Sequence, residues 1–201
     1  KKVVHIPLDN HDGQPGCINI KFLENTLKKN QGNVNYVAIT GVSNVTGIIN
    51  PIYDIAELAH SYDTFIIVDG AQMVAHLPVK ISGHKNPKRN IDAFVFSGHK
   101  AYAPGSPGTV ICRKDILGSI EPEEVGGGMV DRVFLDRYIV SEEFPAREEA
   151  GTPNIAGAIG IAAVIEVLDN IGMDLIFEEE SELIHYTLNQ LKDIPDIQIY
   201  G

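Results

Sequence analysis

The chain has 201 residues, 44% of them hydrophobic and 21% charged, which is typical of a globular protein with one sizeable domain or one domain and part of another. Its formal net charge of −11 argues against non-specific binding to nucleic acid or anionic membranes, because both require a basic surface. Two cysteines are too few for a disulfide framework or a zinc site, and no apolar run reaches the roughly 20 residues of a membrane span. No signal peptide opens the sequence either, so we expect a cytoplasmic protein.

Helical and strand patterns alternate through the first part of the chain. Residues 20–30 have helical spacing with lysines near their end, which predicts a helix. Residues 35–44 form an apolar run that leaves into a polar loop, as a buried strand does. Residues 50–63 predict a second helix, with Asn50 as its N-cap and Pro51 at its first position.

Three further strands are predicted. The β-branched and aromatic run 64–72 ends in Asp-Gly, and the runs 91–100 and 108–114 flank a loop of small residues. Strands that alternate with helices indicate an α/β fold, in which a mainly parallel sheet is covered on its faces.

The pattern changes after the last of these strands. A glycine-rich loop occupies residues 124–132, and residues 144–154 lead into an apolar, alanine-rich helix at 155–172. Residues 173–194 predict another helix, and residues 197–201 predict a strand.

We expect two domains: a large one over residues 1–154 and the beginning of a smaller C-terminal one over residues 155–201. The sequence has no initiator Met, and Lys1 runs almost at once into strand-like sequence. We therefore expect it to be the central part of a longer chain.

Polar side chains follow the predicted strands at the points where they end. In parallel sheets, ligands bind beyond the carboxyl ends of the strands, so these side chains are candidates for a binding site. They are Ser43, Asn44, Asp69, Gln72, Ser97, His99 and Lys100.

Lys100 has a chemistry that no other residue type here shares, because a neutral lysine amine forms a Schiff base with a carbonyl. Pyridoxal phosphate uses such a bond, and its ring then acts as an electron sink for carbanion chemistry at an amino acid's α-carbon. Asp69 could face the ring nitrogen, and Gln72 could donate to the ring's phenolic oxygen. Ser97 and His99 could donate to the phosphate.

Four motifs together carry a resemblance to a known family. They are "VDGAQMVAHLPV", "IDAFVFSGHKAYAPGSPG", "GGGM" and "EEAGTPN", in that order. The chain resembles the class V aminotransferase superfamily over essentially its whole length, and within it the cysteine desulfurase and selenocysteine lyase branch. The Ser-Gly-His-Lys segment after Asp69 is the most specific of these signals.

The resemblance implies a fold-type I enzyme that depends on pyridoxal phosphate, a transferase or lyase acting on an amino acid. Lys100 would be the lysine joined to the cofactor and the group that moves protons. Asp69, Gln72, Ser97 and His99 would take the cofactor contacts described above. Asn44 would contact the substrate carboxylate, and Thr152 would reach the phosphate of a neighbouring subunit, which implies a homodimer with shared sites.

The chain also departs from the family pattern. The usual Gly-Pro-Thr-Gly after the lysine is replaced by the variant loop 103–108. The aromatic residue that stacks on the ring would precede Lys1, and the substrate-binding arginine and the cysteine nucleophile of true desulfurases would follow the chain. Neither Cys17 nor Cys112 matches that nucleophile, and Cys112 is expected to be a small core residue.

Other function classes stay open at this point. A class V aminotransferase would pass the amino group to a keto acid, and a domain without the outlying contacts could be a non-catalytic binding module. An ordinary nucleotide-binding domain is disfavoured. No Gly-x-Gly-x-x-Gly follows the early strands, and the sequence has no Gly-x-x-x-x-Gly-Lys-[Ser/Thr].

Each candidate residue also has a structural interpretation. A lone lysine is more often a surface residue, Asp-Gly is turn chemistry, and Thr152 could belong to the cap of the next helix. Gln72 and Asn44 could be surface and turn residues, and His99 a buried histidine. The remaining histidines are expected to be structural or solvent-facing, with no partner evident for His76; they are His5, His11, His60, His76, His84 and His185.

Overall fold

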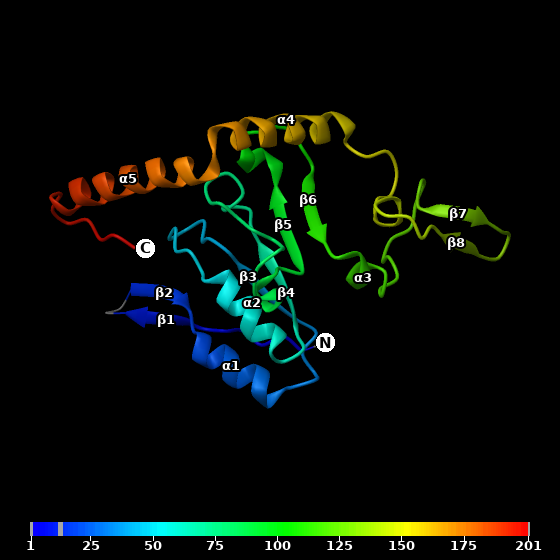
Figure 1. Ribbon diagram of the computed structural model, residues 1–201, viewed down its shortest axis with the longest axis horizontal. Helices are drawn as coiled ribbons and strands as arrows, with labels where there is room; N and C mark the ends of the chain where they lie inside the picture. Colours follow the sequence, from blue (N-terminus) through cyan, green and yellow to red (C-terminus); the bar gives the residue numbers. More distant parts are fainter. Residues whose placement is uncertain (1, 12–13, 201) are drawn as a thin grey trace.

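A four-stranded sheet stands at the centre of the part of the chain that the computed structural model describes, residues 2–11 and 14–200 (Figure 1). Its strands lie in the order β3 (Tyr36–Thr40), β4 (Phe65–Asp69), β5 (Ala93–Ser97) and β6 (Gly108–Cys112). β3, β4 and β5 run parallel, and β6 pairs antiparallel with β5. The predicted α/β fold with a mainly parallel sheet is confirmed, and the four strands predicted for this part of the chain all form.

Helices α1 (Ile20–Lys29) and α2 (Ile52–His60) supply the apolar cover of this sheet. They form where helical spacing predicted them, and each buries an apolar side: α2 packs against β3 and β4, and α1 packs against α2. On the strands, side chains two residues apart point to the same face, so alternate residues enter one core. The core includes Leu23, Leu27, Ile55, Ile66, Val68, Val37, Ile39 and Phe94, all buried.

Asn50 does not cap α2, contrary to the prediction. Pro51 occupies the cap position, with no side-chain hydrogen bond. Asn50 is buried instead: its Oδ1 accepts from the backbone N–H of Ile18 at 3.0 Å, and its Nδ2 donates to the carbonyl oxygen of Thr40 at 3.0 Å. A buried amide must find partners, and here it joins β3 to the N-terminal hairpin.

Two small hairpins lie outside the central sheet. β1 (Leu8–His11) pairs antiparallel with β2 (Gln14–Ile18), and β7 (Val130–Val133) pairs antiparallel with β8 (Tyr138–Val140). The second hairpin extends the glycine-rich loop away from the sheet, at the right of Figure 1.

Short helices occupy several connections. They are η1 (Pro87–Arg89), η2 (Gly98–Ala101), α3 (Lys114–Leu117) and η3 (Ala146–Glu148).

The two C-terminal helices form as predicted: α4 (Ile155–Ile171) and α5 (Met173–Lys192). α4 crosses above the carboxyl end of β5, and α5 continues away from the sheet (Figure 1). The strand predicted at 197–201 is wrong for residues 197–200, which form no strand, while residue 201 lies outside the described residues. A strand needs a hydrogen-bonding neighbour, and no other described segment supplies one there.

Within the described ranges, no single helix is both long and apolar enough to cross a membrane; only α4 and α5 together, bent by 76°, meet that test of length and composition. The same residues contain no group of three or more His, Cys, Asp or Glu side chains placed to hold a metal ion.

A glycine follows each of the three parallel strands directly, and each lies close against a neighbouring side chain. A Cβ added at Gly41 would sit 1.9 Å from Met73 Sδ, and one at Gly70 would sit 1.9 Å from Phe94 Cζ. At Gly98 it would sit 2.3 Å from Ser106 Oγ. Each position thus has too little space for a Cβ unless its neighbour moves, so glycine lets the backbone pass close to these side chains.

Candidate active site

The paired ends of β4 and β5 bring two candidate residues to one edge of the sheet. Asp69 is the last residue of β4 and lies opposite Val95 of β5, two residues before Ser97. Beyond Ser97, η2 carries His99 and Lys100. Because the two strands are parallel, their carboxyl ends meet at this edge, as the sequence pattern predicted.

Asp69 presents its carboxylate at the surface of this edge. Its Oδ1 accepts the backbone N–H of Ala71 at 3.0 Å, a turn-forming contact, and its side chain is exposed. No ion pair within the described ranges involves this carboxylate. Asp69 is therefore a turn residue, as its structural interpretation held. The turn contact uses only one lone pair of Oδ1, so the other lone pairs of the carboxylate are available to a ligand.

The turn that follows Asp69 holds Gln72. The backbone N–H groups of Met73 and Val74 both donate to the carbonyl of Gly70, at 2.8 and 3.0 Å, which winds the chain back toward the sheet. Gln72 is half-buried in this turn. It lies three residues from Asp69 and shares the carboxyl edge with it.

η2 places Lys100 beside Asp69's edge of the sheet. Lys100 is half-buried and His99 is exposed, while Gly98 and Ala101 are buried beneath them. Tyr102 ends the helix with φ +61°, a left-handed conformation that costs a non-glycine residue about 1–2 kcal/mol. The surrounding packing therefore holds this turn in a shape that the local sequence does not favour.

Asn44 and Thr152 lie on loops farther from this turn. Asn44 is exposed in the loop after β3, which Ser43 Oγ organises by accepting the N–H groups of Val45 and Thr46 at 3.2 and 3.1 Å. Thr152 is exposed beside Gly151, whose N–H donates to the carbonyl of Gly127 at 2.7 Å. The structure thus joins the Ala-Gly-Thr-Pro-Asn segment to the Gly-Gly-Gly loop, and leaves the Thr152 side chain at the surface.

Two contacts near this edge were missed at the level of sequence. Asn154 caps α4 and also donates from Nδ2 to the carbonyl oxygen of Gly105 at 2.7 Å, so it reaches the loop that follows Lys100. His76 Nδ1 lies 2.8 Å from Glu180 Oε1, a partner on α5. An asparagine directly before a helical run signals an N-cap, so the capping role of Asn154 was visible in the sequence. Its contact with Gly105, 49 residues away, and that of His76 with Glu180, 104 residues away, leave no local pattern.

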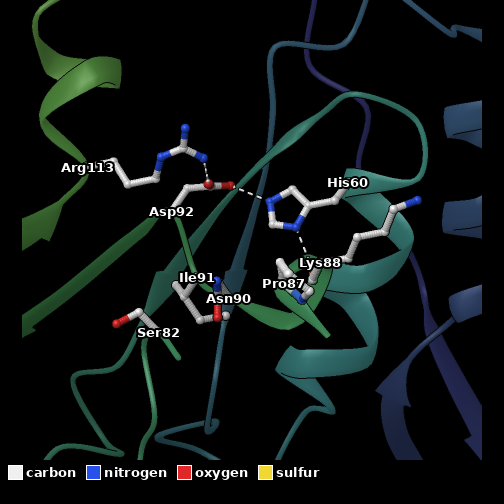
Figure 2. A pocket seen from close by; sticks show the side chains of 8 residues that line it. All are labelled: His60, Ser82, Pro87, Lys88, Asn90, Ile91, Asp92 and Arg113. Carbon is white, nitrogen blue, oxygen red and sulfur yellow. Dashed lines mark hydrogen bonds and ion pairs between the residues drawn. The ribbon is translucent and has the colours of Figure 1, made fainter. Parts of the chain in front are cut away.

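A second polar cluster lies at the opposite, amino edge of the sheet. There a pocket of about 470 Å³ is lined by His60, Ser82, Pro87, Lys88, Asn90, Ile91, Asp92 and Arg113 (Figure 2). Asp92 directly precedes β5, and Arg113 directly follows β6, which runs the other way. This pocket is therefore separated from Lys100 by the length of β5.

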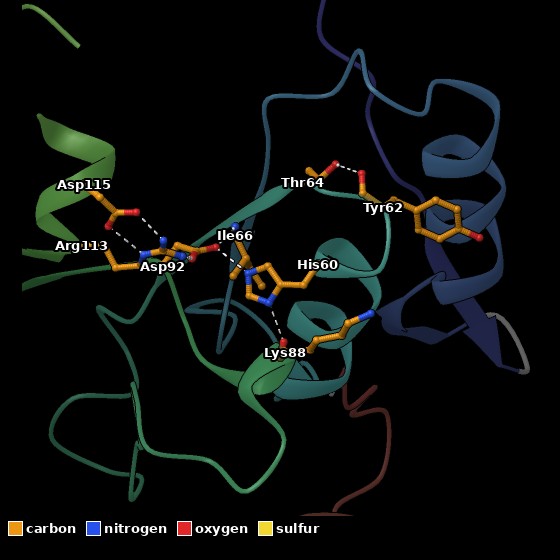
Figure 3. A network of polar contacts seen from close by, with 8 residues as sticks. All are labelled: His60, Tyr62, Thr64, Ile66, Lys88, Asp92, Arg113 and Asp115. Carbon is orange, nitrogen blue, oxygen red and sulfur yellow. Dashed lines mark hydrogen bonds and ion pairs between the residues drawn. The ribbon is translucent and has the colours of Figure 1, made fainter. Parts of the chain in front are cut away.

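Asp92 is the centre of that cluster (Figure 3). Its side chain is 2% exposed, and its oxygens accept from His60 Nε2 at 2.7 Å, the Ile66 N–H at 2.9 Å and Arg113 Nη1 at 2.9 Å. The hydrogen bonds that Arg113 donates to Asp115 and Asp92 raise the pKa of its guanidinium above the usual range. Both oxygens of this buried carboxylate are engaged by donors of the fold, so the cluster fits a structural role, as predicted for His60.

Comparison with known proteins agrees with the resemblance in sequence. The family described as aminotransferase class-V matches residues 2–201. A cysteine desulfurase of Escherichia coli O17:K52:H18 (strain UMN026 / ExPEC) is 41% identical over 165 residues, which cover 82% of this chain and 39% of that protein. The chain thus spans about two fifths of the length of that relative.

Solved structures give the same assignment. The apo structure of a cysteine desulfurase from Thermococcus onnurineus NA1 matches with a TM-score of 0.79 and 33% identity, over 89% of this chain and 42% of that one. A C-DES variant with glycine covalently linked to its pyridoxal phosphate cofactor matches with a TM-score of 0.70, over 87% of this chain and 45% of that one. Its identity of 21% supports the fold alone. Through the match over residues 2–201, the chain belongs to the class V aminotransferase family.

Proposed function

We propose that this chain carries the lysine-bearing part of a pyridoxal phosphate-dependent enzyme that acts on an amino acid, in the manner of the cysteine desulfurases it resembles. The observation that carries the proposal is the placement of Lys100 and Asp69. They lie at the adjacent carboxyl ends of β5 and β4, and neither is engaged in an ion pair within the described ranges.

The donor set at this edge fits the chemistry of the cofactor. Pyridoxal phosphate offers a carbonyl, a ring nitrogen, a phenolic oxygen and a phosphate, and when bound it supplies an electron sink for carbanion chemistry at the α-carbon. Lys100 offers an amine, Asp69 a carboxylate, and Ser97 and His99 offer donors for a phosphate. The buried glycines Gly70 and Gly98 keep the backbone free of side chains at the same edge.

Each side chain has a role that follows from its type. Lys100 would hold the cofactor and accept or deliver the proton at the substrate's α-carbon through its Nζ. The Asp69 carboxylate would hold a proton on the ring nitrogen, since an opposite charge at close range favours the protonated form. Gln72 would donate to the phenolic oxygen, and Ser97 and His99 would donate to the phosphate.

Two more residues would act at the rim of the site. Asn44 would contact the substrate carboxylate from the loop after β3. Thr152 would reach the phosphate bound by a second subunit, so the enzyme would be a homodimer with shared sites. Its exposed position at the surface is what such a contact requires. We further propose a cytoplasmic location for this enzyme.

Support for desulfurization over transamination comes from the relative at 41% identity, which is a cysteine desulfurase. Neither cysteine of the chain is placed to accept sulfur at Lys100. Cys17 lies on β2, and Cys112 lies opposite Ala93 at the amino end of β5. Transamination to a keto acid is the second candidate, because the family match is to the aminotransferases.

The decisive experiment is an absorbance spectrum of the purified protein after incubation with pyridoxal phosphate, beside a Lys100→Ala variant. We expect a visible band in the wild type that borohydride fixes to the protein and that the variant lacks. Mass analysis of the reduced protein should then place the added mass on Lys100. A wild type without any band, or a variant with the same band, would contradict the proposal.

The two candidate reactions separate in a second assay. A desulfurase should release alanine and sulfide from L-cysteine in the presence of a thiol reductant. An aminotransferase should instead consume a keto acid and return the corresponding amino acid. Formation of the new amino acid without sulfide would favour the second candidate.

A further inference from the structure

One asparagine bridges α4 and the loop after Lys100. Asn154 Oδ1 accepts the backbone N–H of Gly157 at 3.0 Å, and Nδ2 donates to the carbonyl oxygen of Gly105 at 2.7 Å. The reverse orientation of the amide would set oxygen against oxygen and NH₂ against N–H, so the two contacts define the orientation. The side chain therefore does more than cap a helix, which needs the oxygen alone.

The loop that Asn154 holds is itself bonded to the Lys100 turn. The N–H of Ala103 donates to the carbonyl of Gly98 at 3.0 Å, and the N–H of Ser106 donates to the carbonyl of Ala103 at 3.2 Å. Gly105 sits between these residues with φ +76°, in the left-handed region. A short series of hydrogen bonds thus leads from Asn154 to the residue that starts η2.

α4 also presses directly on this loop. A Cβ added at Gly157 would lie 2.7 Å from Ser106 Cα, and one at Gly98 would lie 2.3 Å from Ser106 Oγ and 2.8 Å from the Ile161 side chain. Gly157 and Ile161 are four residues apart, so they share one face of α4. Ser106 is therefore enclosed between the helix and the Lys100 turn, and its Oγ is buried without a hydrogen-bond partner among the described residues.

The Lys100 turn has little to fix it from within. η2 is a single turn of 3₁₀ helix without a side-chain cap, and it ends at Tyr102 in a left-handed conformation. Such a turn takes its position from its neighbours. Here those neighbours are the 103–106 loop and the face of α4 that begins at Gly157.

We infer that Asn154 is a positioning residue for the candidate catalytic lysine: by tying the start of α4 to Gly105, it holds the Lys100 turn in the geometry that receives a carbonyl ligand. The inference rests on the proposed function, which assigns the carbonyl chemistry to Lys100. It assigns Asn154 no contact with substrate or cofactor.

Asn154→Asp separates the two roles of the side chain. The carboxylate keeps the oxygen that caps α4, but it replaces the N–H donor with an oxygen that faces the Gly105 carbonyl. Asn86→Asp is a matched control, because Asn86 Oδ1 caps η1 by accepting the Lys88 N–H at 3.1 Å. Within the described ranges, the Asn86 amide NH₂ has no hydrogen-bond acceptor, so this variant loses no donor contact.

The first readout is amide hydrogen exchange in the protein without cofactor. In Asn154→Asp we expect the amides of Ala103 and Ser106 to exchange about tenfold faster, because the loop loses the hydrogen bond that ties Gly105 to α4. The amides of α2 should stay unchanged, and Asn86→Asp should match the wild type throughout. If α4 unfolds in Asn154→Asp, Asn154→Ser keeps a capping oxygen on a shorter side chain and gives the same test.

The second readout is spectroscopic, and a purely structural cap would not change it. With pyridoxal phosphate added, Asn154→Asp should need about tenfold more cofactor than the wild type to reach half of the visible band. At equal occupancy, borohydride should fix the cofactor to this variant more slowly. Equal exchange rates at Ala103 and Ser106 in the two Asn→Asp variants, or an unchanged band, would overturn the inference. If wild type shows no band, the proposed function fails, and the inference that Asn154 serves a catalytic lysine fails with it, whatever the exchange rates are.

Discussion

The two edges of the central sheet carry similar side chains in opposite states. At the amino edge, Asp92 is buried and its oxygens are occupied by three donors from other segments (Figure 3). At the carboxyl edge, Asp69 is exposed and accepts a single backbone N–H. A carboxylate with all of its partners inside the fold stabilises that fold, whereas one left open can bind something else.

The histidines of the two edges repeat this contrast. His60 lies between the Lys88 carbonyl, 2.6 Å from Nδ1, and Asp92 Oδ2, 2.7 Å from Nε2. Both of its ring nitrogens thus face oxygen atoms of other segments. His99 is exposed and has no such pair of partners among the described residues. The pocket lined by His60, Asp92 and Arg113 therefore lies at the structural edge, whereas the proposed site lies at the edge with exposed polar side chains.

The largest expected effect comes from breaking the amino edge. Asp92→Ala would leave His60, Arg113 and the Ile66 N–H without their acceptor, and we expect it to lower the free energy of unfolding by about 3–5 kcal/mol. Urea denaturation measures this change. Asp54→Ala, which removes an exposed pair with Arg89, serves as control and should cost at most about 1 kcal/mol. Similar losses in the two variants would remove the distinction between the edges.

A substitution at the carboxyl edge should lower the activity and leave the free energy of unfolding almost unchanged. Asp69→Asn keeps an oxygen for the Ala71 N–H, so the free energy of unfolding should change by less than about 0.5 kcal/mol. If the proposed function holds, turnover of L-cysteine should fall about 100-fold, because the charge that would face the ring nitrogen is lost. Urea denaturation and steady-state kinetics on the same preparation test both halves. A large loss of stability would show that Asp69 belongs to the fold in the way that Asp92 does.

Two glycines of α4 sharpen the comparison at smaller scale. Gly157→Ala would force a Cβ to 2.7 Å from Ser106 Cα, and we expect a loss of about 1–3 kcal/mol. Gly160→Ala meets nothing within 4 Å, so better helix propensity should stabilise the protein by about 0.5–1 kcal/mol. The midpoints of thermal and urea unfolding should therefore fall in Gly157→Ala and rise in Gly160→Ala. Shifts of the same sign would mean that α4 does not rest on the 103–106 loop.

The smallest effect concerns the rim of the amino edge and its response to pH. The hydrogen bond from Arg113 lowers the pKa of the exposed Asp115 carboxyl. A lowered pKa in the folded protein stabilises it above the ordinary carboxyl pKa, and this contribution disappears as the pH falls through the lowered value. The stability difference between wild type and Asp115→Asn should thus be small at neutral pH and vanish in acid. A difference that grows in acid would contradict the assigned direction.

The sequence predicted the parts of the site that are local. An apolar run followed by polar residues marked the ends of β4 and β5, and a shared edge for Asp69 and Lys100 followed from parallel pairing. The helix after residue 154 was equally visible, because its spacing and capping residues are adjacent in the chain. These features depend on the backbone and on nearest neighbours, which a sequence displays directly.

Tertiary contacts were beyond sequence analysis. Asn50 has the residue type and position of a helix cap, yet burial gave it two backbone partners elsewhere. Cys112 was expected in the core but is only half-buried, on the strand at the open edge of the sheet, although burial still raises the pKa of its thiol. Strand order and the choice of partners depend on segments far apart in the chain, so no periodicity reveals them.

The three glycines that follow the parallel strands have a consequence for protein engineering. A Cβ at any of them would lie within 2.3 Å of a neighbouring side chain, so Gly41, Gly70 and Gly98 are poor positions for a substitution library. The residues just before them lie at the ends of the strands, where Thr40 and Asp69 are exposed and Ser97 is half-buried. A library that varies these three and preserves the glycines would change the chemistry of the edge while its scaffold stays intact.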